Sequence, residues 1–348
     1  MAEEPTPFTL TRAGVRLEGE VSGEGAPLVL LHGLTATRRY VVHGSRALER
    51  AGFRVAAFDA RGHGESSRAD APSEYTYDRM VADALAVMDH FGWERAALAG
   101  QSMGSATALG LAVAHPQRVS GLVVITPAHR GAPSGERALA RWDRLADALE
   151  SGGPQAFLAA LEPFTMDERY RATVRRVIAQ RLARHRDPAA VADAMRGVPR
   201  SRAFAGLEAL EGLSIPTLIV ASRDESDPDH PLEIAREYRR LIPDSRLVIE
   251  GPGESPLAWR GGGASPGIGA HPGGRGGAGA GWPERAPGGK RRCRPRDARF
   301  RPPGAPVRGP ARPRRAGSRP IPPGQRSVRR SARAVRAGDR PAARAARP

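Results

Sequence analysis

Ser102 stands at the centre of a Gly-Gln-Ser-Met-Gly run, between a short apolar segment at 96–99 and a small-residue segment at 105–115. A serine hydroxyl is a poor nucleophile until the backbone presents it at a sharp bend beside a base. Gly100 and Gly104 allow a strand to turn abruptly into a helix without a side-chain clash. Such a bend raises the hydroxyl above a sheet edge and directs the N–H groups of the helix N-terminus toward a developing oxyanion. The pattern therefore indicates acyl transfer by a serine nucleophile.

The elements that must position this serine are short apolar runs separated by helical segments. We predict strands at 28–31, 54–58, 96–99, 122–125, 216–221 and 246–250, and the short apolar runs at 28–31 and 54–58 are typical of strands covered on both faces. Residues 8–10 and 15–21 are predicted to be two antiparallel strands that precede them. Strands that alternate with helices predict an α/β fold with a mostly parallel, doubly wound sheet and right-handed crossovers.

Between these runs, apolar residues recur at the spacing of a helix. We predict helices over 38–51, over 231–241, and from a Thr76 N-cap to a stop at Gly92. The methionines of the helix after Thr76 fall on its apolar stripe, so we interpret them as core residues. Residues 127–212 are mostly helical, and Arg and Glu dominate their polar faces.

Four motifs follow one another along the chain: LHG at 31–33, DARGHGESS at 59–67, GQSMG at 100–104 and PTLIVASRD at 216–224. In content and order they resemble the α/β-hydrolase family over roughly the first 258 residues. The resemblance implies an α/β-hydrolase domain at 1–258, with a helical cap insertion at about 130–212 that covers the active site and sets specificity. A generic doubly wound domain with a Gly-Ser-Gly turn does not account for the order of the motifs.

The same resemblance implies which backbone groups surround the nucleophile. The oxyanion would be held by the backbone N–H groups of Leu34 and Met103, each of which could contribute roughly 3–4 kcal/mol to the transition state. His32 and Gly33 would support this loop structurally. The glycine-punctuated loop that carries Arg61, His63 and Ser66 is also one that the family uses structurally.

The acid of the site is expected on the loop after the strand at 216–221. Asp224 follows this strand by a short turn, where the family carries the carboxylate that orients the base. Glu225 and Asp227 are alternatives on the same loop.

The base is where the sequence departs from the family. After the last strand the family normally has Gly-His followed shortly by Pro, and here Glu254 stands at the position of the histidine. A solvated glutamate is a weak base at neutral pH. Three alternatives remain. The imidazole comes from elsewhere, with His230 the best candidate because it lies six residues after Asp224. Otherwise Glu254 is the base, or the site is inactive and the fold is kept for binding.

The C-terminal part of the chain holds the excess positive charge. The formal net charge is +17, and residues 261–348 contain 22 Lys and Arg against 3 Asp and Glu. Arg, Gly, Ala and Pro make up 70 of these 88 residues, and leucine is absent. Such a segment buries too little apolar surface to offset its ordering entropy, so residues 259–348 are predicted to be a disordered tail.

This composition has two alternative interpretations, a nucleic-acid-binding tail and a translation in a shifted frame. An Arg/Gly/Pro segment can bind nucleic acid, but the only aromatic residues of 261–348 are Trp282 and Phe300, which does not favour recognition by base stacking. We prefer the hypothesis that a GC-rich gene is read in a shifted frame from about 259–261 onward.

Several classes of protein are not favoured by the sequence. A run of about 18 apolar residues is missing, as is a secretory signal, so neither a membrane span nor export is expected. The single cysteine is Cys293 in the tail. A cytoplasmic location is the default expectation. The chain has no metal-ligand spacing and no glycine-rich phosphate loop, so no metal or cofactor is expected.

The sequence therefore predicts a serine hydrolase that cleaves a small carboxylic ester, lactone or related acyl substrate through an acyl-enzyme on Ser102. The family also contains haloperoxidases, dehalogenases and aminopeptidases, but a serine rather than an aspartate nucleophile indicates acyl chemistry. The alternative is a non-catalytic α/β-hydrolase-like protein that binds a ligand under its cap. The partner expected is a small molecule, and the oligomeric state does not follow from the sequence.

Overall fold

The computed structural model describes residues 4–162 and 166–251, all within one of the two units into which the chain divides, Met1–Arg285. Glu254, the expected domain end at 258 and the predicted tail at 259–348 lie outside the described residues.

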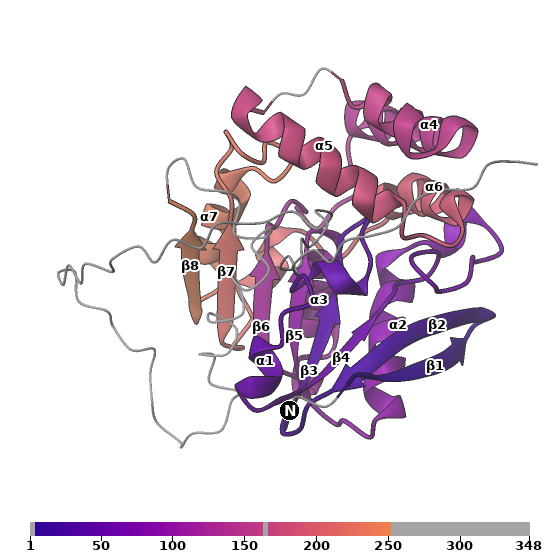
Figure 1. Cartoon of the computed structure of the whole chain (residues 1–348). Helices are drawn as coiled ribbons and strands as arrows, with labels where there is room; N and C mark the ends of the chain where they lie inside the picture. The colour runs from indigo at the N-terminus through magenta and orange to yellow at the C-terminus, as the bar shows by residue number, and fades with distance from the viewer. Residues whose placement is uncertain (1–3, 163–165, 252–348) are drawn as a thin grey trace, which may run out of the picture. The chain divides into compact units, whose positions relative to one another are not determined.

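An eight-stranded sheet runs through the described residues in the order β1-β2-β4-β3-β5-β6-β7-β8 (Figure 1). The strands are β1 (Thr6–Arg12), β2 (Val15–Ser22), β3 (Ala26–Leu31), β4 (Phe53–Phe58), β5 (Ala96–Gln101), β6 (Val119–Ile125), β7 (Thr217–Ala221) and β8 (Ser245–Ile249). Strand β2 pairs antiparallel with β1 and β4, and the remaining neighbours are parallel. The mostly parallel α/β sheet predicted from the sequence is confirmed.

Helices follow most of the strands. They are η1 (Arg38–Tyr40), α1 (Ala47–Arg50), η2 (Pro72–Glu74), α2 (Tyr77–His90), α3 (Met103–Ala114), η3 (Pro116–Arg118), α4 (Glu136–Ala160), α5 (Glu168–Leu182), α6 (Pro188–Gly197), η4 (Val198–Arg200), η5 (Leu207–Leu210) and α7 (Leu232–Leu241). Thr76 caps α2 as expected, because its side-chain oxygen accepts the N–H of Arg79 at 3.3 Å. Within the described ranges, every helix is too short or too polar to cross a bilayer.

Residues 38–51 do not form the single helix predicted for them. The structure has only η1 and α1 in this segment. Between them His43 and Gly44 have φ angles of 51° and 76°, in the left-handed region, which a right-handed helix cannot contain. The apolar spacing of the segment did not reveal this break.

Strand β5 lies at the centre of the sheet and is buried along its whole length. Ala96 and Leu98 join the core that α2, α3 and α7 share on one face, whereas Ala97 and Ala99 point into the second cluster on the opposite face. The residue that follows β5, Ser102, is therefore attached to a strand that is packed on both faces.

Helices α4, α5 and α6 form an insertion between β6 and β7 and lie together at one end of the sheet (Figure 1). They have a small apolar core of their own, which includes Leu145, Leu149, Phe157 and Leu182. Gly153, with φ of 63°, and the following Pro154 kink α4. The helical character predicted for residues 127–212 agrees with this arrangement.

Candidate active site

Ser102 occupies a sharp turn between β5 and α3. Its φ and ψ are 51° and −110°, a conformation that a residue with a side chain rarely adopts. The turn is held from two sides, because the Ser102 N–H donates to the carbonyl of Ile125 and its own carbonyl accepts the N–H of Ser105, both at 2.9 Å. The strained backbone thereby presents the hydroxyl away from the sheet.

Two glycines make this turn sterically possible. A Cβ at Gly100 would overlap the backbone of Gly104, and a Cβ at Gly104 would overlap the carbonyl of Leu31. A Cβ at Gly33 would only touch the Gln101 carbonyl oxygen and the side chain of Ser102, both at 3.4 Å. The close approach of β5, α3 and the end of β3 therefore depends on glycine at positions 100 and 104.

Substituting Gly104 by alanine is expected to lower the free energy of unfolding by about 1–3 kcal/mol, because the added methyl group must displace backbone atoms. Urea denaturation followed by circular dichroism measures this change. Gly212→Ala is the matched control, since a Cβ there meets no atom within 4 Å. Equal urea midpoints for the two variants would contradict the steric argument.

His230 lies between Ser102 and an aspartate on the loop after β7. Its Nε2 is 2.9 Å from the Ser102 Oγ, and its Nδ1 is 2.9 Å from Oδ1 of Asp227. The carboxylate fixes the ring so that Nδ1 carries the proton and Nε2 faces the hydroxyl. The three side chains have the geometry of a Ser-His-Asp triad.

Asp224, the expected acid, is not the carboxylate beside His230. It is exposed, and its Oδ1 accepts the N–H of Leu232 at 2.8 Å, at the start of α7. Asp227 lies in a tight turn, in which its N–H donates to the carbonyl of Arg223 at 3.0 Å and its carbonyl accepts the N–H of His230 at 3.1 Å. This turn directs the alternative carboxylate, Asp227, toward the imidazole.

Glu250, which sequence reasoning did not single out, supports the same loop. It is 2% exposed, and its Oε1 accepts the N–H of Arg223 at 2.8 Å and the hydroxyl of Ser226. Arg223 also donates from Nε to the Glu250 carbonyl at 3.0 Å. The only sequence signal is an acidic residue directly after the last apolar run, which by itself is typical of a solvated loop.

The charges around His230 raise the pKa of its imidazole above the ordinary value. Burial of the ring lowers this pKa, but the charge of Asp227, the hydrogen bond to Asp227 and the charge of Asp229 together outweigh it. The positive charge of Arg181 acts in the opposite direction. Because only neutral imidazole can accept a proton, a reaction that uses His230 as base should increase as pH rises through this raised pKa.

Leu34 and Met103, whose backbone N–H groups are the expected oxyanion donors, line the same cavity as Ser102. Within the part of the chain that the structure describes, neither donates a hydrogen bond to another protein group. Met103 is the first residue of α3, so the positive end of the helix dipole adds to its N–H. These two donors are free to bind an oxygen atom beside the hydroxyl.

The cavity above Ser102 has a volume of about 800 Å³, within the usual range for small-molecule sites. Ser102 and His230 open into it from the sheet side, and α4 and α5 supply the opposite wall. The apolar part of this wall consists of Trp142, Leu145, Phe157, Leu161 and Ile178.

Residues 26–260 match the family described as alpha/beta hydrolase fold. The chain belongs to this family. The match covers more than half of the sequence and includes every strand from β3 onward, as well as Ser102, Asp227 and His230.

Named members of the α/β-hydrolase family are similar to this chain to different extents. It is 32% identical to a 2-hydroxymuconate semialdehyde hydrolase of Pseudomonas sp. over 252 residues, which cover 69% of this chain and 83% of that protein. It is 35% identical to epoxide hydrolase B of Mycobacterium tuberculosis over 122 residues, which cover 33% of this chain and 34% of that protein.

A solved structure of an esterase from Thermogutta terrifontis shares 26% identity with a TM-score of 0.62, covering 76% of this chain and 97% of the esterase. Several curated relatives are matched over only 30–41% of their own length.

His32 stabilises the loop that carries Leu34 in this α/β-hydrolase. Its Nε2 accepts the N–H of Ala60 at 2.9 Å, and its Nδ1–H donates to the carbonyl of Gly33 at 2.9 Å. Both ring nitrogens are therefore occupied, which agrees with a structural role for this side chain.

His185 connects the insertion to the same loop. It follows α5, donates from Nε2–H to the carbonyl of Thr35 at 3.0 Å and accepts the N–H of Gly64 at Nδ1, at 2.8 Å. His63 lies between it and His32, with ring centroids 5.6 and 5.1 Å away. The buried imidazoles of His32, His63 and His185 thus form a column that connects the insertion to the loop that carries Leu34.

This column should make the fold sensitive to acid. Burial lowers the pKa of His185 to about 4, and it also lowers those of His32 and His63. The unfolded chain, with an ordinary histidine pKa of about 6.5, binds protons first, so stability is complete above that pH and is lost as pH falls toward 4. Each histidine contributes up to about 1.4 kcal/mol per pH unit in this window.

The His185→Gln variant tests this expectation. Its free energy of unfolding, from urea titrations at pH values between 4 and 7, should fall less steeply on acidification than that of the unmodified protein. An identical slope would show that protonation of this column does not limit acid stability.

The 59–67 motif is held by buried ionic contacts. Arg61 is 0% exposed and forms two hydrogen bonds with Asp83, at 2.8 and 2.9 Å, and a third with the Glu74 carbonyl at 3.0 Å. Ser66 donates to the Asp59 carbonyl at 2.6 Å. These contacts agree with a structural interpretation of the motif.

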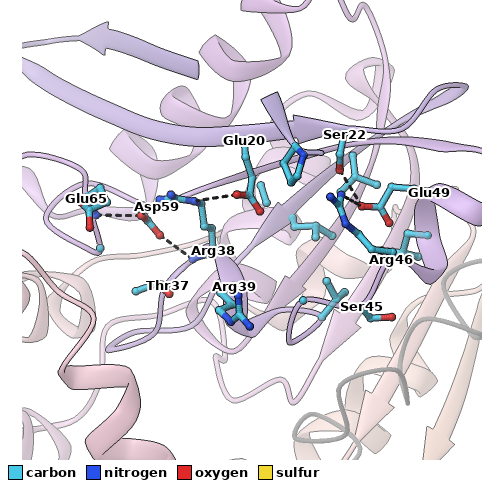
Figure 2. Close-up of a pocket in the computed structure, with 18 of the residues that line it drawn as sticks. Glu20, Ser22, Thr37, Arg38, Arg39, Ser45, Arg46, Glu49, Asp59 and Glu65 are labelled. Atoms are coloured by element: carbon cyan, nitrogen blue, oxygen red, sulfur yellow. Dashed lines mark hydrogen bonds and ion pairs between the residues drawn. The ribbon is translucent and has the colours of Figure 1, made fainter. Parts of the chain in front are cut away.

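A second cavity of about 400 Å³ lies beside β2, β4 and α1 (Figure 2). Its lining contains neither Ser102 nor His230. Figure 2 shows Arg38 between Asp59 and Glu20, and Arg46 pairs with Glu49 at 2.8 Å. Because these charges compensate one another and no activated nucleophile is present, the larger cavity is the candidate active site.

Proposed function

We propose that the protein is a serine hydrolase that cleaves a small carboxylic ester, lactone or related acyl substrate through an acyl-enzyme on Ser102. The observation that carries this proposal is His230, whose two nitrogens lie 2.9 Å from Ser102 and from Asp227. A base is therefore available without Glu254, and the main ground for an inactive, ligand-binding site is removed.

The proposed reaction begins when Ser102 attacks the substrate carbonyl and His230 accepts the hydroxyl proton. Asp227 stabilises the imidazolium that forms. The N–H groups of Leu34 and Met103 bind the oxyanion, each contributing about 3–4 kcal/mol to the transition state. The imidazolium then protonates the leaving oxygen, and a water molecule activated by the same imidazole hydrolyses the acyl-enzyme.

The similar proteins support hydrolysis as the reaction class. One is named as a hydrolase of a semialdehyde and another as an esterase. An apolar cavity above the triad suits a small organic acyl compound better than a polymer, because it is closed on one side by α4 and α5.

Labelling with a fluorophosphonate probe tests the proposal, because the probe reacts covalently with activated serines. The full-length protein should be labelled and Ser102→Ala should not. Ser134→Ala is the matched control, since Ser134 lines the same cavity but makes no hydrogen bond to a histidine in the described structure, and labelling should persist.

Failure of labelling would favour the alternative function. If circular dichroism shows folded protein, and the probe and a panel of short esters leave it unmodified and unhydrolysed, the protein binds a ligand under its helical insertion without acyl transfer.

A further inference from the structure

Arg181, in the last turn of α5, brings a positive charge to the cavity that contains Ser102 and His230. Its Nε is buried without a hydrogen-bond partner. Throughout the described ranges, no carboxylate forms an ion pair with its guanidinium, whereas Arg141 in the same cavity pairs with Asp229 at 3.0 Å. The charge of Arg181 is therefore not neutralised by a direct contact.

Arg181 is partly buried, and a guanidinium whose Nε is buried without a partner is costly, so proteins rarely retain one without a use. Burial lowers the pKa of Arg181, which shows that its charged form is poorly solvated. Arg137 also lines the cavity, but it is exposed, so water can solvate it. Asp227 and Asp229 are already engaged with His230 and Arg141. Glu136 also lines the cavity, but it is exposed and forms no ion pair with Arg181 in the described structure, so a bound ligand can supply the counter-ion.

Arg181 acts on the side of the cavity where the reaction would occur. Its charge lowers the pKa of His230. It also contributes to the lowered pKa values of His32 and His185, which flank the loop that carries Leu34. The neighbouring wall is apolar, formed by Phe157, Ile178 and other side chains of the insertion. A ligand that satisfies both features has an apolar body and an anionic group close to the reacting carbonyl.

We propose that Arg181 binds a carboxylate of the substrate, so that the substrate is an acyl compound with a second, anionic group. This inference rests on the proposed serine hydrolase function and narrows its substrate class. The planar guanidinium presents paired donors that match a carboxylate. Among the described cations of the cavity that have no ion pair, only Arg181 is partly buried, and one such cation balances one negative charge, which favours a carboxylate over a doubly charged phosphate.

The contact between Arg181 and the carboxylate would orient the substrate and would discriminate against neutral analogues. With its carboxylate on Arg181, the substrate is held with its reacting carbonyl toward Ser102. A neutral analogue of the same shape would leave the guanidinium buried and unpaired, and sites of this kind reject such analogues strongly.

Two chromogenic esters of equal shape test the proposal. One is mono-4-nitrophenyl glutarate, which carries a free carboxylate, and the other is its neutral methyl ester. The full-length protein should prefer the acid on the order of 10- to 100-fold in kcat/KM, the range expected for a charged hydrogen-bonded contact. Arg181→Gln should lose this preference, mainly through KM, and Arg181→Lys should retain part of it.

Arg176→Gln is the matched control, because Arg176 lies exposed on the same helix and makes no contact with the cavity. It should keep the full preference. Thermal unfolding checks that each variant is folded. Arg181→Gln should unfold at no lower temperature than the unmodified protein, since a partly buried, unpaired charge has been removed.

Two results would overturn the inference while the proposed function stands: equal kcat/KM for the two esters, or an Arg181→Gln variant that still prefers the acid. If neither ester is cleaved and the fluorophosphonate does not react, the proposed function fails instead. Calorimetric titration with monomethyl glutarate then decides the inference. Binding that is lost in Arg181→Gln supports the carboxylate site, and absence of binding overturns it.

Discussion

Replacing His230 by alanine is expected to lower kcat/KM for an ester substrate by about 10⁴- to 10⁶-fold, because the Ser102 hydroxyl then loses the group that accepts its proton. Thermal unfolding should change little, since the ring is partly exposed. Steady-state hydrolysis of 4-nitrophenyl esters measures the loss. Added imidazole should restore part of the activity by occupying the space that the side chain vacates.

Glu254→Gln distinguishes the two candidate bases in the same assay. If His230 is the base, the Glu254 variant should retain its activity. Activity that survives His230→Ala and disappears in Glu254→Gln would assign the base to the glutamate. A Ser102→Ala/His230→Ala double variant should be no less active than either single variant, because the two residues act as one unit.

The second large effect is expected at Asp227. Asp227→Asn should lower kcat by about 10²- to 10⁴-fold, because an amide neither stabilises the imidazolium nor fixes the tautomer that presents Nε2 to Ser102. The charge of Asp227 raises the pKa of His230, so the acidic limb of the residual pH–rate profile should move to lower pH. A stopped assay across pH 5–9 measures both changes.

Asp224→Asn is the control for this experiment. Its new side-chain carbonyl can still accept the N–H of Leu232, so activity should persist and stability should change by less than about 1 kcal/mol. A larger loss of kcat in Asp224→Asn than in Asp227→Asn would return the acid role to Asp224.

The turn at Ser102 was predictable from sequence because the glycines that allow it lie close to Ser102 in the chain. Gly100 and Gly104 flank Ser102 within five residues, and the backbone overlaps that forbid side chains there involve the turn itself and the end of β3. The sheet was predictable for a related reason, since burial of β5 on both faces requires an unbroken apolar run.

The acid could not be chosen from sequence because four carboxylates share the short loop between β7 and α7. Spacing after β7 favoured Asp224, but the hydrogen bond from the Asp227 N–H to Arg223 and the support from Glu250 decide which side chain faces the imidazole. These contacts bring Glu250, the residue after β8, against the loop after β7, which no local pattern encodes.

Arg181 could not be identified as a cavity residue from the sequence, for a different reason. The helical pattern of the insertion shows many arginines, and periodicity does not say which of them faces the cavity. That choice depends on how α5 lies over the ends of the strands, which is a property of the tertiary structure. The break at His43 was missed because a positive φ at a non-glycine residue has no reliable sequence signal.

The hydrogen bond from the His230 N–H to the Asp227 carbonyl places acid and base on one four-residue turn. When this turn shifts as a unit, the two side chains stay together and only their separation from the nucleophile changes. The position of this turn relative to Ser102 therefore decides whether the His230 Nε2 reaches the hydroxyl. A transplant of residues 223–230 into another scaffold would have to include a counterpart of Glu250, because its carboxylate accepts the Arg223 N–H and the Ser226 hydroxyl.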